Sequence, residues 1–220
     1  MSSSPHPAAD QQFPERIPSE PAVTAGGAGI PGRYDWLAPV ALFVLVTALY
    51  LPSISNGFVF DDHLLILQQS QPDSIGDLLR VFTERHWPDL PYYRPVARFT
   101  MVAQKMLHGE RAAPYHAFNA GVMGLVAAAA YLLLRTPTLG VRAPVAWLGA
   151  LLVGVHPIAS SCVYPICSGR ETSLPALFML LTTCAWLRSG PVWRMIALVA
   201  LGAALLSKEQ AIVMPLILVI

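Results

Sequence analysis

Charged residues are scarce in this 220-residue sequence, at 12% of the chain, and neither sign is in excess, since the formal net charge is only +1. Soluble domains carry about twice that share of charge. With 55% hydrophobic residues and a mean hydropathy of +0.52, the composition indicates a membrane protein that crosses the bilayer several times. A nucleic-acid-binding protein needs a clustered basic face, so we exclude nucleic acid as a partner.

Cysteine is also rare, with three residues in the chain. Cys162 and Cys167 lie beside Pro165 in a segment that we place in an external loop. They would form either a local disulfide in an oxidising compartment or two partly buried free thiols, and we expect the free thiols. Cys184 lies inside an apolar run and is expected to be a small packing residue.

The first part of the sequence lacks apolar periodicity. Residues 1–33 are rich in Ser, Pro, Ala and Gly, and such a segment buries too little apolar surface to offset the entropy of ordering. We therefore expect a disordered cytoplasmic tail. We do not interpret it as a signal peptide, because the first apolar run begins only at Trp36 and no small-residue cleavage site follows that run.

Long stretches without charge define the remainder, residues 34–220, as a transmembrane domain of about six spans. A span must be helical, because lipid offers no partners for backbone N–H and C=O groups, so we expect an all-α, polytopic fold. The sequence ends inside a hydrophobic run at Ile220, which we interpret as a fragment of a longer protein or a truncated reading frame. The expected spans are Trp36–Leu51, Ala117–Leu134, Pro144–Ser161, Thr172–Leu187, Trp193–Leu206 and an incomplete one from Ala211.

Arginine placement predicts the orientation. Arginines precede the first span and flank the short loops after the second and fourth: Arg16, Arg33, Arg135, Arg142, Arg188 and Arg194. Under the positive-inside rule these loops and the amino terminus are cytoplasmic. The external or lumenal end then collects most of the other distinctive ionisable residues, from loops far apart in the sequence: Asp61, Asp62, Arg94, His156, Arg170, Glu171, Lys208 and Glu209.

The predicted external loop, residues 52–116, has its own pattern. Ile75, Leu78, Leu79 and Phe82 recur at helical spacing and form one apolar stripe. We expect an amphipathic helix lying on the membrane surface, and a second one over residues 96–107.

Several short motifs occur in a fixed order: Asn-Gly-Phe-Val-Phe-Asp-Asp-His at 56–63, Tyr-Arg-Pro-Val at 93–96, Tyr-His-Ala-Phe-Asn at 115–119, His-Pro at 156–157, Ser-Gly-Arg-Glu at 168–171 and Ser-Lys-Glu-Gln at 207–210. In this order they resemble the amino-terminal membrane part of the transmembrane and TPR-repeat-containing O-mannosyltransferases and their bacterial relatives. That family is similar in fold to the C-type glycosyltransferases, and the resemblance covers residues 36–220.

The resemblance implies a membrane glycosyltransferase that moves a sugar, mannose in that family, from a polyprenyl or dolichyl phosphate to Ser or Thr of a protein on the non-cytoplasmic side. Such a reaction needs a base for the hydroxyl proton and cations for the leaving phosphate. Asp61 or Asp62 is the candidate base. The candidate substrate-binding residues are Arg94, His156, Arg170, Glu171, Lys208 and Glu209.

Other interpretations of these residues remain open at this stage. An acid pair directly after a span can simply mark its end, and Arg170 with Glu171 can form a local ion pair. We assign no metal site, since three consecutive residues such as 61–63 seldom converge on one ion, although a divalent cation is compatible with the chemistry. The resemblance is incomplete, because Ala159, Ser160 and Ser161 stand where the family commonly has His, Thr and Glu.

A non-catalytic membrane scaffold or a transporter-like helical bundle is therefore the alternative function. The expected location is the inner membrane of a bacterium or the endoplasmic reticulum of a eukaryote. The expected partners are the lipid-phosphate sugar, a protein acceptor and the lipid bilayer.

Overall fold

The computed structural model describes residues 36–87 and 90–219, and every regular element within these ranges is helical. The expected all-α fold is confirmed for this part, whereas the predicted disordered tail, residues 1–33, lies outside it. The elements are α1 (Leu37–Tyr50), η1 (Leu51–Ser55), the π-helical η2 (His63–Leu67), α2 (Ile75–Arg80), α3 (Pro95–His108), α4 (Ala112–Leu134), α5 (Ala143–Val155), η3 (Pro157–Cys162), α6 (Ile166–Trp186), α7 (Pro191–Leu205), η4 (Glu209–Val213) and α8 (Met214–Val219).

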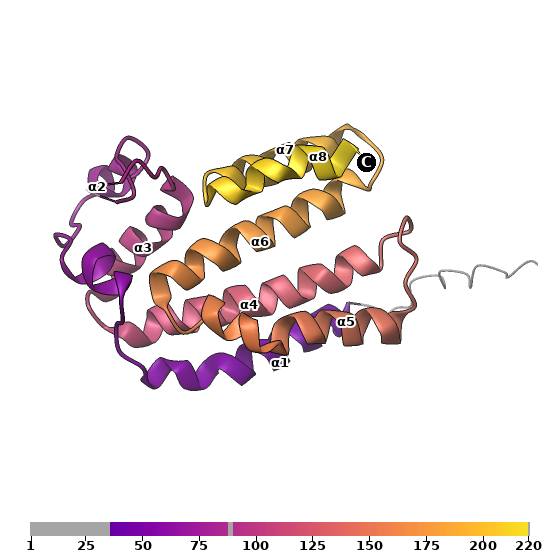
Figure 1. Ribbon diagram of the computed structural model, residues 1–220, viewed down its shortest axis with the longest axis horizontal. Coiled ribbons are helices and arrows are strands. Elements are labelled where there is room, and N and C mark those ends of the chain that lie inside the picture. The colour runs from indigo at the N-terminus through magenta and orange to yellow at the C-terminus, as the bar shows by residue number, and fades with distance from the viewer. Residues whose placement is uncertain (1–35, 88–89, 220) are drawn as a thin grey trace, which may run out of the picture.

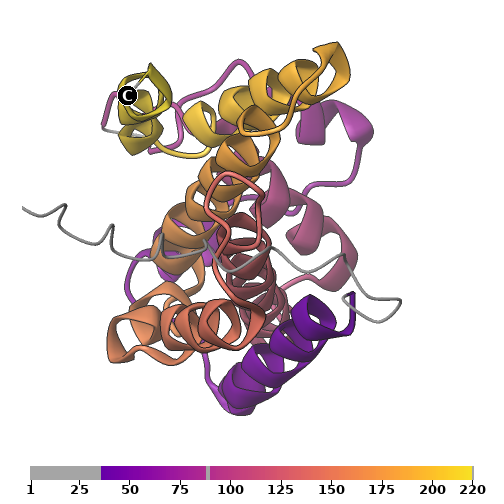
Figure 2. The same cartoon turned by 90° about the vertical axis from the view of Figure 1, so that its right-hand side faces the viewer.

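Helix α4 is the centre of the bundle. Helices α1, α5 and α6 pack against it, and α7 packs against the other side of α6 (Figures 1 and 2). Its small residues Ala120 and Ala127 are fully buried against Val46 of α1 and Leu174 of α6. Because α4 carries no charge from end to end, it can be surrounded by other helices without leaving an unpaired ion.

Close backbone approach fixes how α1 sits against its neighbours. A Cβ added at Gly124 of α4 would lie 2.7 Å from the Phe43 carbonyl oxygen, and one at Gly154 of α5 would lie 2.6 Å from a methyl carbon of Val46. The hydroxyl of Tyr50 donates to the Gly154 carbonyl over 3.0 Å. Small residues at such crossings are typical of helix packing in membranes, where dispersion contacts and buried hydrogen bonds hold the helices together.

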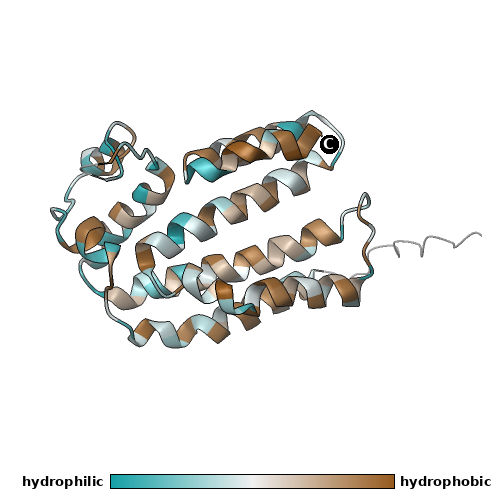
Figure 3. Cartoon of the chain, in the orientation of Figure 1, coloured by the Kyte–Doolittle hydropathy of each residue, from teal (hydrophilic) through white to brown (hydrophobic). Residues whose placement is uncertain are grey.

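Apolar residues predominate in the helices of the bundle (Figure 3), and many large ones face outward. Val44, Leu148, Leu152 and Val199, on α1, α5 and α7, are each more than half exposed. Such a surface is costly in water. Two segments, Leu37–Ser55 and Ala112–Leu134, are long and apolar enough to cross a membrane, and three shorter apolar helices accompany them: Ala143–Val155, Pro191–Leu205 and Glu209–Val219.

The two ends of the bundle differ in chemistry. The α4–α5 and α6–α7 loops lie at the same end of the bundle, at the right in Figure 1, and carry Arg135, Arg142 and Arg188, with Arg194 in the first turn of α7; we call this the arginine end. The opposite end, which we call the polar end, contains the end of α1, the starts of α4 and α6 and the end of α7. Helices α2 and α3 cover it, and the Val96 amide of α3 donates to the Leu206 carbonyl beyond α7 over 3.1 Å.

Observed helices match most of the predicted spans, with two shifted starts and one earlier end, since α5 ends at Val155 and the rest of the predicted span Pro144–Ser161 belongs to the 3₁₀ helix η3. Helix α4 begins at Ala112 rather than Ala117, and α6 begins at Ile166 rather than Thr172. Cys167 therefore lies in the first turn of α6 and not in a loop, which corrects the sequence-based placement. The expectation of free thiols is confirmed for all three cysteines.

The first predicted surface helix is shorter than its apolar stripe. Helix α2 ends at Arg80, and Ser74 caps its first turn by a reciprocal exchange of hydrogen bonds with Asp77. Ile75, Leu79 and Phe82 are nonetheless exposed, so the stripe still presents apolar side chains at the surface. The second predicted helix is present as α3.

Candidate functional site

The acid pair forms the second half of a tight turn over residues 59–62. The Asp62 amide donates to the Val59 carbonyl over 3.0 Å, and Phe60 inside the turn has a φ of +49°. This left-handed backbone costs a bulky residue about 1–2 kcal/mol. The turn gives the two neighbouring carboxylates different environments, since Asp62 is fully buried and Asp61 is only half-buried.

Asp62 caps the amino-terminal end of α6. One carboxylate oxygen accepts the Cys167 amide over 2.8 Å, and the other accepts the amides of Ile166 over 3.3 Å and Val59 over 3.0 Å. Ile166 and Cys167 are the first two residues of α6, whose amides have no partner inside the helix. A carboxylate at this position also meets the positive end of the helix dipole. Asp62 therefore works as a helix cap supplied from a segment remote in sequence, which is why α6 can begin earlier than predicted.

Asp61 is the more accessible acid. Within residues 36–87 and 90–219, no hydrogen bond or ion pair engages its carboxylate. Partial burial, followed by the negative charges of Glu171 and Asp62, raises the pKa of Asp61 above its ordinary value. Of the two acids, only Asp61 has both the solvent access and the free lone pairs that a general base needs.

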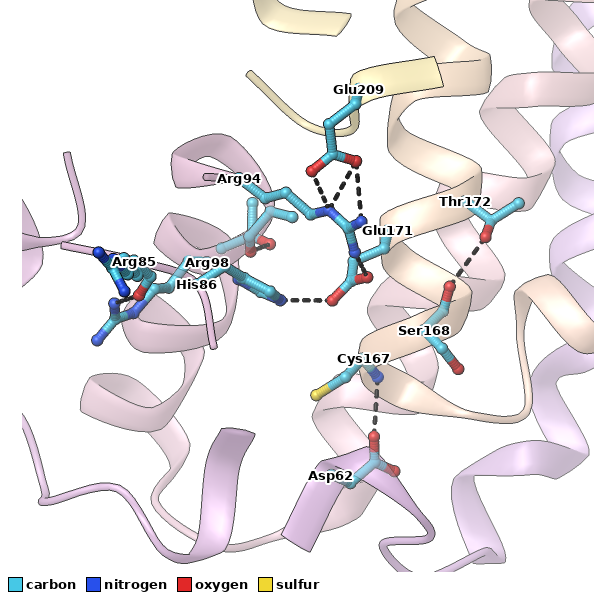
Figure 4. A network of polar contacts seen from close by, with 12 residues as sticks. Asp62, Arg85, His86, Arg94, Arg98, Cys167, Ser168, Glu171, Thr172 and Glu209 are labelled. Carbon is cyan, nitrogen blue, oxygen red and sulfur yellow. Dashed lines mark hydrogen bonds and ion pairs between the residues drawn. The ribbon is translucent and has the colours of Figure 1, made fainter. Parts of the chain in front are cut away.

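A charge network joins three segments beside the acid pair (Figure 4). At its centre is Arg94, whose Nη1 donates to a buried oxygen of Glu171. Its Nε and Nη2 grip Glu209, with Nε 3.1 Å from Oε1 and 3.2 Å from Oε2, and Nη2 2.8 Å from Oε2. The second oxygen of Glu171 bonds to Nε2 of His86. The network therefore ties α6 and η4 to the loop that precedes α3.

Local structure places Arg94 at the centre of this network. Arg94 is the residue before α3, where Pro95 fixes the first helical φ, and its guanidinium lies 4.6 Å above the Tyr92 ring. Burial alone would lower the pKa of Arg94, but the hydrogen bonds and charges of Glu209 and Glu171 hold it above the ordinary value. Arg94 is thus a fully charged, stacked and doubly paired guanidinium.

Glu209 is the exposed member of the network. Its side chain is 51% exposed, against 6% for Glu171. Partial burial alone would raise the pKa of Glu209, but its hydrogen bonds from Arg94 and the charge of the adjacent Lys208 keep it below the ordinary value. Lys208 is half-buried on extended backbone directly before η4.

Arg170 lies on α6 next to Glu171 but belongs to a different set of contacts. It is fully buried, donates to the Asn119 side chain over 3.0 Å and to the Tyr115 carbonyl over 3.3 Å, and stacks 4.3 Å over the Phe118 ring. These partners belong to the Tyr-His-Ala-Phe-Asn motif of α4. The local ion pair between Arg170 and Glu171 is therefore not formed, because the two side chains leave the helix in different directions.

His156 does not join the network. It ends α5, is exposed, and its Nδ1 accepts the Ile158 amide over 3.2 Å at the start of η3. This corrects the prediction that it converges with the other site residues. His86, by contrast, is buried at the centre of the site. No sequence motif distinguished His86, because it lies in an irregular stretch without periodicity, and only its partner Glu171 reveals its role.

In the part of the chain that the structure describes, no group of three or more His, Cys, Asp or Glu side chains is arranged to hold a metal ion. The site therefore offers the half-buried carboxylate of Asp61 and, in the adjoining network, the guanidinium of Arg94, with Lys208 next to Glu209 in the chain. This combination suits removal of a hydroxyl proton and stabilisation of a nearby anion.

Comparison with known proteins gives two related matches. The chain is 30% identical over 191 residues to the human protein O-mannosyl-transferase TMTC3, a match that covers 80% of this chain and 20% of the human protein. It is 29% identical over 182 residues to the mouse protein of the same name, covering 76% of this chain and 19% of the mouse protein. The chain thus spans about one fifth of the length of these relatives. No family model matches the sequence, and no solved structure matches it.

Proposed function

We propose that the chain belongs to the transmembrane and TPR-repeat-containing O-mannosyltransferase family and carries part of the membrane site of a protein glycosyltransferase. The proposed donor is a sugar, mannose in the named relatives' reaction, on a polyprenyl or dolichyl phosphate, and the acceptor is Ser or Thr of a protein. The observation that carries this proposal is the meeting of Asp61, Glu171, Arg94 and Glu209 from distant segments at the polar end of an apolar helical bundle. The similarity to TMTC3 supports it.

The chemistry follows from the accessible acid. Asp61 takes the proton of the acceptor hydroxyl as the oxygen attacks the anomeric carbon of the donor. The bond between that carbon and the phosphate oxygen breaks, and the electron pair leaves with the polyprenyl phosphate. A single displacement of this kind inverts the anomeric configuration. The raised pKa of Asp61 brings it closer to the proton affinity that a general base needs at neutral pH.

The basic groups receive the leaving phosphate in this proposal. Arg94 offers a planar fork that matches two phosphate oxygens, and Lys208 adds a point charge. Glu171 fixes Arg94 from the buried side together with His86. Arg170 shapes the site indirectly, because it anchors α6 to α4. His156 supports the turn after α5 and has no direct role. A divalent cation beside the phosphate remains compatible with the exposed carboxylates.

The proposed setting is a multi-pass protein with the polar end on the external or lumenal side and a cytoplasmic amino terminus. The membrane is the inner membrane in a bacterium or the endoplasmic reticulum in a eukaryote. A transporter would carry its polar groups near the bilayer midplane, whereas here they gather at one end of the bundle. Single cysteines at positions 61 and 208 should react with a membrane-impermeant maleimide from one side only, and cysteines at 188 and 194 from the other.

Sugar transfer to a Ser/Thr peptide from a radiolabelled lipid-phosphate donor tests the reaction itself, in the membrane-inserted, full-length protein. Asp61→Asn should reduce transfer by about 100-fold or more, the usual contribution of a general base. A matched control is Asp73→Asn, which removes an exposed acid of the same loop region outside the network. Full activity in Asp61→Asn would remove the proposed base, and absence of transfer in the unchanged protein would favour the scaffold alternative.

A further inference from the structure

The Arg94 guanidinium is held by two carboxylates that differ sharply in exposure. Glu171 is buried and is itself bonded to His86, so it is a fixed counterion. Glu209 is half exposed and binds the outward-facing Nε and Nη2 edge through both of its oxygens. That edge is the one that a phosphate monoester or diester would grip.

The charge balance of the site opposes anion binding in this arrangement. The carboxylates of Asp61, Glu171 and Glu209 and the buried helix cap Asp62 accompany the basic side chains of Arg94 and Lys208 and the imidazole of His86, so negative charge is in excess even when His86 is protonated. A phosphate that entered without displacing any of them would meet an excess of negative charge. Asp61 is needed as the base and Glu171 is buried, which leaves Glu209 as the group that can move.

Glu209 is also on an element suited to movement. It is the first residue of η4, a short 3₁₀ helix between α7 and α8, and the preceding Lys208 is extended. Three hydrogen bonds to Arg94 hold Glu209 in the site, and its exposed carboxylate can be hydrated when it leaves. The cost of breaking a half-exposed pair is small compared with that of a buried one.

We propose that Glu209 is a latch that occupies the phosphate position on Arg94, and that a prenyl phosphate binds by displacing its carboxylate. The latch keeps the guanidinium paired and oriented while the site is empty, and Lys208 becomes available to the phosphate when Glu209 leaves. This inference rests on the proposed function, because it takes the phosphate of the donor as the ligand. It reverses the sequence-based view of Glu209, which becomes a competitor of the substrate instead of a contact to it.

A binding measurement tests the latch without relying on turnover. Farnesyl monophosphate is titrated into the intact protein in detergent micelles by calorimetry, with farnesol as the probe that lacks the phosphate. Glu209→Gln keeps the size of the side chain and removes its charge, and it should bind farnesyl monophosphate about three- to tenfold more tightly, the range expected for loss of one partly exposed competing charge. Glu209→Ala removes the latch and should show the same direction.

Glu84→Gln is the matched control. Glu84 is 47% exposed and pairs with Arg98 over 2.8 Å, so it forms a similar ion pair outside the network. Its replacement should leave the affinity unchanged. Arg94→Lys in the Glu209→Gln background should lose the gain, because lysine has no fork.

The possible results separate the latch from the proposed function. Equal or weaker binding by both Glu209 variants, with phosphate-dependent binding in the unchanged protein, overturns the latch and leaves the lipid-phosphate donor in place. Absence of any preference for farnesyl monophosphate over farnesol, in all variants, overturns the donor assignment and the latch with it.

Discussion

The two adjacent acids give the sharpest prediction, because they have the same charge and different structural roles. Asp62→Asn should destabilise the fold, whereas Asp61→Asn should leave stability unchanged. The Asp62 carboxylate accepts three backbone amides, from Val59, Ile166 and Cys167. An asparagine has one acceptor oxygen, and its amide group donates. In either flip state at least one buried backbone donor would face another donor.

The magnitude follows from the lost partners. A buried donor left without an acceptor costs about 1–3 kcal/mol, and loss of the negative charge at the start of α6 adds about 0.3–1 kcal/mol. We therefore expect Asp62→Asn to cost about 1–4 kcal/mol, a large part of the roughly 5–15 kcal/mol that holds a typical domain. Asp61→Asn should stay within about 0.5 kcal/mol, as most half-exposed positions do.

Reversible unfolding in mixed micelles, followed by tryptophan fluorescence, measures both variants under the same conditions. The same preparations can be assayed for sugar transfer, where Asp61→Asn should show the loss of about 100-fold or more although it is stable. The reasoning is refuted if Asp62→Asn is as stable as Asp61→Asn, because the three hydrogen bonds would then contribute nothing to the placement of α6.

Three further predictions concern the surroundings of the acid pair. The negative charge of Glu171 contributes to the raised pKa of Asp61, so Glu171→Gln should move the acidic limb of the pH–rate profile to lower pH, and an unshifted limb would exclude Asp61 as the base. A pKa that is raised in the folded state also means that the fold loses stability as the pH rises through the pKa of Asp61. Glu171→Gln should therefore lose less stability over that pH range. Gly169→Ala should cost about 1–3 kcal/mol in the same unfolding assay, since the added Cβ would lie 2.7 Å from the carbonyl oxygen that ends η3, while the control Gly202→Ala, with open space around its Cβ, should be neutral or stabilising. Phe60→Gly should be neutral or stabilising, because glycine adopts a φ of +49° without strain, and Phe60→Val should destabilise by about 1 kcal/mol, because a β-branched residue resists this φ more than phenylalanine does; equal stability of these two variants would show that the turn relaxes.

Much of the fold could be predicted from the sequence, because its determinants are local. A run of residues without charge in a protein of this hydropathy has few options other than a helix, and each predicted span corresponds to an observed helix. Helix starts were less predictable. Arg170 and Glu171 were expected just outside a span, yet they lie inside α6, because the cap that starts this helix comes from Asp62, about one hundred residues earlier.

The candidate site was predictable only in part, for a related reason. Motifs named Asp61, Arg94, Glu171 and Glu209 individually, and these do lie in or beside one network. His86 carried no signal, because an isolated histidine in an irregular segment has no periodicity or spacing to identify it.

By itself, the sequence determined that this chain folds largely as apolar helices, because long runs without charge leave backbone hydrogen bonding inside a helix as the main option. Only the tertiary structure decided which acid is a cap and which is accessible, and which arginine is buried among neutral partners and which is paired with carboxylates. Those distinctions depend on which backbone amides, rings and carboxylates surround each side chain, and these neighbours come from segments that no local pattern connects.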